Sequence, residues 1–255
     1  MLVLRLSTTH FFFARMEQGR VFEYKKYQLQ SHLSLIEQLR DAVDHCPLCQ
    51  PLPAEGVVVS IVGAYTPVPM ADFQEEVCDS FYNYCVNPEV KHRVFYDLIP
   101  AANVALLFGL PELTCQAIED VFEQVHYVSA MSPVMKRMLR HGAPLQLLVN
   151  IHEQAVDLMC SEGNRLSMVN AYSVQTADDV AYYTLNVINQ LGLKPENLRV
   201  SVVGSSAERN PIIARLLTFV PHVVPVLPSQ EYDHEMASDN ELPYDLITYL
   251  LSKIK

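Results

Sequence analysis

LQLLVNIHEQAVDLMCSEGNRLSMVNAY, residues 145–172, contains three short apolar segments separated by two short turns. Segments of this length and composition, with connections this short, are typical of β-strands joined in hairpins. A helix is expected next, because Thr176 and Asp179 have the spacing of a capping box and apolar residues recur at helical spacing up to Gly192. The expected strands cover 145–151, 155–161 and 165–172.

The first half of the chain has the same order of elements. Ser34 and Glu37 form a capping-box pattern after three apolar segments. A nearly all-apolar strand is expected at 57–62, and a similar one at 198–203 in the second half, as in sheets that are covered on both faces. The other strands expected in the first half lie at 2–7, 10–16, 21–29, 93–99, 103–109 and 125–130, and helices are expected after Ser34, at 72–86 and from Pro111.

This duplicated order indicates two related α/β domains with mixed sheets. We expect the first domain at 1–130, a junction helix at 131–144 that Ser132-Pro133 opens, and the second domain at 145–255. In the second domain, the pair Asn210-Pro211 predicts the start of a helix. The remaining expected elements are a strand at 222–226 and a helix at about 243–254.

The composition is that of a compact globular protein with a strong negative charge. Half of the 255 residues are apolar and 18% are charged, which excludes the disordered class. Eighteen Lys and Arg against 29 Asp and Glu give a net charge of −11, which repels phosphate backbones and anionic lipids, so we expect no nucleic-acid and no membrane partner.

No apolar stretch approaches the roughly 20 residues of a membrane helix. The amino terminus lacks the pattern of a signal peptide, so we expect a cytoplasmic protein.

The six cysteines are expected to be free thiols, because a chain of this size without a secretory signal does not need a disulfide framework. Cys46 and Cys49 form a C-x-x-C motif, which can hold half of a zinc site or act as a redox pair. No second pair with suitable spacing accompanies it. The motif also follows a helix instead of opening one, so no helix dipole would lower its thiol pKa. We interpret both residues as ordinary buried or loop cysteines and expect no metal site.

The duplicated order of elements resembles the actin-like ATPase fold shared by actin, the heat-shock chaperone ATPases and the sugar kinases. More closely, the chain is similar to a bacterial family of unknown function assigned to that fold. The resemblance implies two duplicated ribonuclease H-like domains, each with a mixed five-stranded sheet flanked by helices. The segments that carry it are LVLRLSTTHFFFARM (2–16), the stretch Tyr65–Pro69, TADDVAYYTLNVINQLGL (176–193) and VVGSSAERNPIIARLL (202–217).

In such ATPases the resemblance implies two Asp-x-Gly hairpins that hold the phosphates and the metal, and a Gly-rich loop beside the adenosine. Glycine lets backbone N–H groups approach phosphate, and a carboxylate suits a hard cation. The corresponding hairpin residues are Ser7–Thr9 and Asn150–His152, and both lack the Asp and the Gly. Asn150 can still donate to a phosphate and Glu153 can supply a carboxylate, but ordinary strand turns are the favoured interpretation.

Gly204, Ser205 and Ser206 form a third candidate nucleotide contact. They lie between a buried strand and a helix, where α/β proteins bind ligands and where a helix N-terminus can bind an anion. A P-loop would need a second glycine and a lysine where Arg209 and Asn210 stand. A tight turn with helix capping is therefore the favoured role, and a nucleotide contact is the alternative.

Two functional hypotheses from different classes remain. The first is a non-catalytic actin-like protein that binds another protein through its cleft or the outer face of a domain. The alternative is an ATPase or phosphotransferase with altered phosphate loops, which would need ATP and magnesium. The missing Asp-x-Gly features favour the first hypothesis, because phosphoryl transfer depends on the placement of metal and donors. We therefore expect a protein partner and no cofactor.

Overall fold

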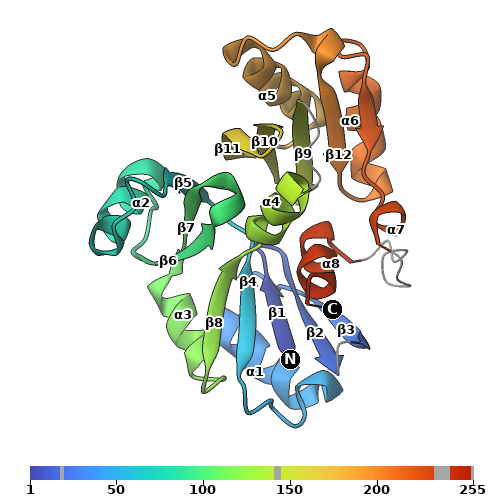
Figure 1. Ribbon diagram of the computed structural model, residues 1–255. Coiled ribbons are helices and arrows are strands. Elements are labelled where there is room, and N and C mark those ends of the chain that lie inside the picture. Colours follow the sequence, from blue (N-terminus) through green and yellow to red (C-terminus); the bar gives the residue numbers. More distant parts are fainter. Residues whose placement is uncertain (18–19, 141–144, 233–241, 254–255) are drawn as a thin grey trace. The chain divides into compact units, whose positions relative to one another are not determined.

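The computed structural model describes residues 1–17, 20–140, 145–232 and 242–253. The chain divides into two compact units, one made of Met1–Pro133 with the last residues of the chain, and the other of Val134–Leu251. Each unit contains a five-stranded mixed sheet with helices packed against it (Figure 1). The predicted pair of five-stranded mixed sheets is confirmed.

The sheet of the first unit is built from strands that are far apart in the sequence. They are β1 (Leu2–Leu6), β2 (His10–Glu17), β3 (Arg20–Gln28), β4 (Val57–Ile61) and β8 (Val125–Ser129). The order across the sheet is β3-β2-β1-β4-β8. The first three strands are antiparallel, and β1, β4 and β8 run parallel to one another.

The sheet of the second unit has the same order and the same strand directions. Its strands are β9 (Gln146–His152), β10 (Ala155–Glu162), β11 (Arg165–Ser173), β12 (Arg199–Val203) and β13 (Val223–Pro225). They lie in the order β11-β10-β9-β12-β13, with β9, β12 and β13 parallel. The repeat seen in the sequence is therefore a repeat of sheet topology.

A pair of helices packs together in each unit. The pairs are α1 (Leu35–His45) with α3 (Glu112–Glu119), and α5 (Ala177–Gln190) with α6 (Ser206–Leu216). The predicted capping boxes of α1 and α5 are confirmed, since Ser34 with Glu37 and Thr176 with Asp179 exchange hydrogen bonds in both directions. Each box satisfies backbone donors at a helix start that would otherwise lack partners.

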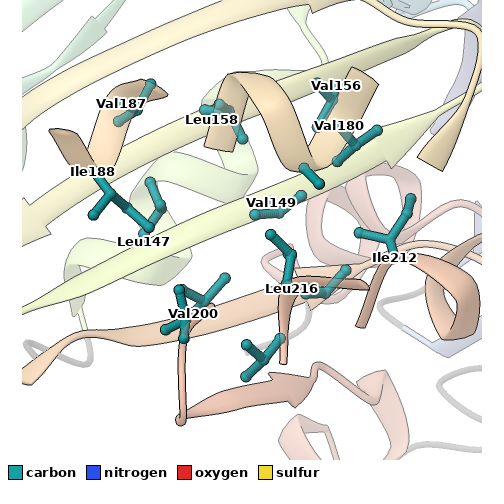
Figure 2. Packing of buried hydrophobic residues seen from close by; sticks show 14 of the residues in the cluster. Leu147, Val149, Val156, Leu158, Val180, Val187, Ile188, Val200, Ile212 and Leu216 are labelled. Carbon is teal, nitrogen blue, oxygen red and sulfur yellow. The ribbon is translucent and has the colours of Figure 1, made fainter. Parts of the chain in front are cut away.

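The core of the second unit lies between the sheet and the helices α5 and α6. Figure 2 shows Leu147 of β9 beside Ile188 of α5, and Val149 of β9 between Val180 of α5 and Leu216 of α6. Successive residues of a strand point to opposite faces, so these side chains face the helices and the residues between them face away. The polar side chain of Asn150 therefore lies on the face of the sheet that α5 and α6 do not cover.

The first unit also contains a small three-stranded sheet that the second unit lacks among its described residues. It has the order β5-β7-β6 and is accompanied by one helix, and the elements are β5 (Tyr65–Pro69), α2 (Cys78–Val86), β6 (His92–Ile99) and β7 (Val104–Pro111). In the second unit, β12 leads directly into α6, so the sheet is an insertion between β4 and α3. The expected helix at 72–86 is shorter than predicted, because Glu75–Val77 form a 3₁₀ turn that no side chain caps.

The remaining expected elements agree with the structure to within a few residues, whereas the short helix at Pro228–Glu231 is not among the expected elements. The expected junction helix begins one residue before Ser132, and residues 141–144, with its expected end at Gly142, lie outside the described residues, as does Ile254 at the end of the expected last helix. Within the described chain, no helix is long and apolar enough to cross a membrane. The helices whose bounds have not yet been given are α4 (Met131–Arg140), α7 (Pro228–Glu231) and α8 (Tyr244–Leu251).

Candidate functional site

The turn between β1 and β2 uses its polar atoms to close itself. The hydroxyl of Ser7 donates to the carbonyl of His10 at 2.7 Å and accepts from the His10 N–H at 3.3 Å. The hydroxyl of Thr9 shares a hydrogen bond of 2.7 Å with Nδ1 of His10, and the Thr9 carbonyl accepts from the N–H of Leu29. Ser7 is also buried. The side chains of Ser7 and Thr9 are thus committed to the turn.

The turn between β9 and β10 corresponds to the turn between β1 and β2. It lies two residues later in the chain than the match of Asn150–His152 with Ser7–Thr9 implies. His152 pairs with Ala155, so the turn residues are Glu153, which has a φ of 54°, and Gln154. The Gln154 carbonyl accepts from the N–H of Val174, as the Thr9 carbonyl accepts from Leu29 in the first unit. Ser7 therefore corresponds to His152. The predicted match of Ser7 with Asn150 is not the one that the turns show.

Asn150 and His152 are instead drawn together by a buried carboxylate on the neighbouring strand. Oδ2 of Asp157 accepts from Nδ2 of Asn150 at 3.0 Å and is hydrogen-bonded to Nε2 of His152 at 2.8 Å. Asp157 faces Asn150 directly across the β9–β10 ladder and is 4% exposed. The hairpin residues selected from the sequence did not include this carboxylate. Its signal was an acidic residue inside the apolar segment AVDLMCS.

Gly204 is required by a close approach of two strands. It follows the last residue of β12 and has a φ of +147°, which residues other than glycine rarely adopt. A Cβ at this position would lie 3.2 Å from Cβ of Ile151 and 3.4 Å from its Cδ1. The backbone conformation and the close packing thus account for a glycine at this position without a bound phosphate.

The helix after Gly204 starts earlier than predicted. Ser205 is the N-cap of α6, and its N–H and hydroxyl donate to Oε2 of Glu208 at 3.2 and 2.6 Å, while the Glu208 N–H donates back to the hydroxyl at 3.4 Å. The predicted start at Asn210-Pro211 is therefore wrong, and Pro211 lies inside the helix. The pattern Ser-x-x-Glu in the sequence was the missed signal.

This capping box changes what the loop can bind. A bound anion at a helix N-terminus uses the free backbone N–H groups and the positive end of the helix dipole. Here the carboxylate of Glu208 accepts from the N–H and the hydroxyl of Ser205, and so adds a negative charge at the start of the helix. Arg209, the nearest cation in the sequence, donates to the carbonyls of Gly204 at 3.3 Å and of Val226 at 3.4 Å. The loop is stabilised by its own side chains.

The candidate residues fall into three groups. Asn150 and His152 meet at Asp157, and Gly204 lies against Ile151 at the end of β9, so these two groups are neighbours within the second unit. The capped serines follow Gly204 in the same loop. Ser7 and Thr9 belong to the hairpin of the first unit.

A cavity of about 580 Å³ lies at the other end of the second sheet, near the start of β9 and β12. Leu148, Val134 and Leu227 contribute apolar walls, and Arg137 and Arg199 contribute the cations. Nη2 of Arg137 donates to the backbone carbonyl of Glu231 at 3.1 Å, and its guanidinium lies 3.8 Å from the Glu231 carboxylate. None of the candidate nucleotide-contact residues lines this cavity.

The C-x-x-C cysteines are buried in the first unit. Cys46 follows the end of α1, Cys49 lies in the 3₁₀ turn Pro47–Cys49, and both are fully buried. Burial, and after it the neighbouring Cys46, raise the pKa of Cys49 to about 12. Over the described residues, no group of three or more His, Cys, Asp or Glu side chains is arranged to hold a metal ion.

We expect one thiol of the folded chain, Cys85, to react with iodoacetamide at pH 8. The other five cysteines are buried, and burial raises the pKa of Cys115 and of Cys160 to about 11, which keeps these thiols protonated at that pH. Intact-mass spectrometry should show a single adduct on the native protein and six adducts in denaturant. Cys85→Ser should remove the native adduct. Rapid labelling of Cys46 or Cys49 would contradict the buried assignment.

Comparison with known proteins places the chain in the fold that its topology suggests. The model of a family described as "Protein of unknown function (DUF3822)" matches residues 1–223. No curated protein matches the sequence. A solved protein of Bacteroides thetaiotaomicron, with actin-like ATPase fold and unknown function, is similar with a TM-score of 0.84 at 19% identity, covering 98% of this chain and 94% of that one. The PilM-PilN type IV pilus biogenesis complex is similar with a TM-score of 0.61 at 10% identity, covering 100% and 98%.

Proposed function

The chain belongs to the DUF3822 family of proteins of unknown function and has the actin-like ATPase fold, and from this premise we propose that it is a non-catalytic protein that acts by binding another protein. The observation that carries the proposal is that the phosphate-loop positions are used for internal contacts. Ser7 closes its own turn, Asn150 and His152 are bound to Asp157, and Ser205 and Glu208 form the capping box of the helix after Gly204.

Catalysis of phosphoryl transfer would need groups that these positions do not offer. The reaction depends on donors and a metal placed around the transferred phosphate. A charge-assisted hydrogen bond contributes roughly 1.5–3 kcal/mol, so the loss of several weakens nucleotide binding by orders of magnitude. The Glu208 carboxylate at the start of α6 would also repel a phosphate. These features support a role without ATP or magnesium.

A binding role is compatible with the fold. The solved PilM-PilN complex is a type IV pilus biogenesis assembly whose matched chain shares this fold at 10% identity. That likeness concerns the fold alone, and it supports the proposal by showing that a chain of this architecture is found in a complex with another protein. Fold and function are separable, so the partner of this chain follows from its own surface chemistry.

We expect no saturable heat when Mg-ATP is titrated into the full chain up to about 1 mM, a concentration that would reveal even weak binding. Phosphate release from ATP should proceed at the rate measured without protein. A titration with magnesium alone serves as the control for dilution heat. The proposal fails if Mg-ATP binds with a micromolar dissociation constant that Ser206→Val weakens while the circular dichroism spectrum stays unchanged.

A further inference from the structure

The insertion in the first unit presents a helix that the fold itself does not require. The second unit connects β12 to α6 without a comparable sheet, and its five-stranded sheet has the same order as that of the first unit. The elements β5, α2, β6 and β7 are thus an addition to one of two equivalent repeats.

Helix α2 is held in place by one buried face. Cys78 and Tyr82 pack with Val68 and Leu107 in a small core. The Tyr82 hydroxyl lies 3.2 Å from Nδ1 of His92 and 3.4 Å from the carbonyl of Ala64. The ring also lies so close to β7 that a Cβ at Gly109 would be 2.9 Å from it. This buried face therefore fixes the helix to its sheet.

A stripe beside this buried face, which begins at Val77 just before α2, carries large apolar residues in contact with water. Val77 is 47% exposed, Phe81 41% and Tyr84 88%. Their spacing of four and three residues places them on one stripe of the helix. Single exposed apolar residues are ordinary, but a contiguous stripe that includes two aromatic rings is typical of an interaction site, where aromatic side chains contribute most of the binding energy.

The surroundings of the stripe are acidic. From Met70 to Val90 the chain has five acidic residues and neither lysine nor arginine. Acidic residues in the first turn stabilise the helix dipole, which accounts for part of this bias. Because no basic residue of the segment neutralises them, they also give this part of the surface a negative potential. The acidic residues are Asp72, Glu75, Glu76, Asp79 and Glu89.

We propose that the exposed face of α2 binds an amphipathic, positively charged segment of another protein. Apolar side chains of the segment would pack on Val77, Phe81 and Tyr84, as amphipathic helices do in apolar grooves. Lysine or arginine at its rim would face the acidic residues, which favours encounter and orientation. This inference rests on the proposed function, since it assigns the protein-binding role to one surface.

Charge argues against other occupants of this face. A second copy of the chain would bring the same acidic surface, and with a net charge of −11 the two copies repel each other. Nucleic acid and anionic lipid carry the same sign as the surface. A basic segment is the occupant whose charge and apolar surface both match.

The test uses peptides selected from a random library displayed on phage and panned against the full chain. We expect the enriched peptides to carry apolar residues three or four apart and an excess of lysine and arginine. A synthetic copy of the most enriched peptide is then titrated by fluorescence anisotropy. Its dissociation constant should rise at least about tenfold for the double variant Phe81→Ser/Tyr84→Ser, because two aromatic anchors are lost.

The matched control is Tyr182→Ser, which removes a tyrosine that is 65% exposed on α5 of the other unit. The control should bind the peptide as the unmodified chain does, and both variants should keep the thermal unfolding midpoint. Enrichment of acidic peptides, the absence of any enriched peptide, or unchanged affinity in the double variant would each overturn the assignment to α2. Peptides that bind independently of α2 leave the protein-binding function standing, whereas Mg-ATP binding defeats that function itself.

Discussion

Replacement of Asp157 by alanine is expected to lower the free energy of unfolding of the second unit by about 3–5 kcal/mol. The carboxylate is 4% exposed and holds Asn150 at 3.0 Å and His152 at 2.8 Å. Alanine removes the acceptor but leaves both partners in place, so the amide of Asn150 loses its hydrogen bond inside the protein. Unsatisfied groups of this kind cost more than the bond itself contributes.

Urea unfolding followed by circular dichroism would measure the loss, and hydrogen exchange of the β9 and β10 amides would assign it to the second unit. Asp157→Asn keeps the volume and one carbonyl oxygen, so we expect a smaller loss. Glu162→Ala removes the same charge from an exposed position at the end of β10 and should change stability by less than about 0.5 kcal/mol. A loss for Asp157→Ala as small as this control would show that the contacts are not stabilising.

Elements that are determined by neighbouring residues were predictable from the sequence. Ser34 and Thr176 cap their helices through contacts with a residue three positions later, so a short pattern contains the whole interaction. The duplicated strand order was also visible, because each strand has its own apolar segment and short turns. These local features are sufficient for the five-stranded sheets and for the fold class.

The start of α6 shows how one local signal can hide another. Asn210-Pro211 has the form of a helix start, but the capping pattern that begins at Ser205 lies earlier in the chain. Pro211 lacks an N–H for the helix ladder, yet the burial of Ile212 and Leu216 compensates for the lost hydrogen bond. Tertiary packing thus overrides the local preference of proline.

Features that depend on distant residues were not predictable in the same way. Strand β5 contains Pro67 and Pro69, which disfavour a strand, and it forms because an edge strand needs fewer backbone donors. The contacts of Asp157 with Asn150 and His152 depend on the pairing of β9 with β10, and the turn position decides which residues meet. A one-residue change of register would have placed them on opposite faces. The candidate site was therefore foreseen as a set of loops, but not as a network.

Replacement of Gly204 by alanine is the second change with a large expected effect, a loss of about 2–4 kcal/mol in the free energy of unfolding. A φ of +147° costs an alanine roughly 1–3 kcal/mol in backbone strain, and a Cβ placed 3.2 Å from Cβ of Ile151 adds a steric cost because neither strand can move freely. Gly163→Ala is the matched control, since Gly163 has a φ of +58° and nothing within 4 Å of an added Cβ, so it should lose about 1 kcal/mol from strain alone. Equal losses in the two variants, measured by urea unfolding, would mean that the approach of β12 to Ile151 leaves room for a side chain. A larger loss at Gly204 would show that this glycine, at the position where ATPases of this fold contact their nucleotide, is needed for packing in this chain.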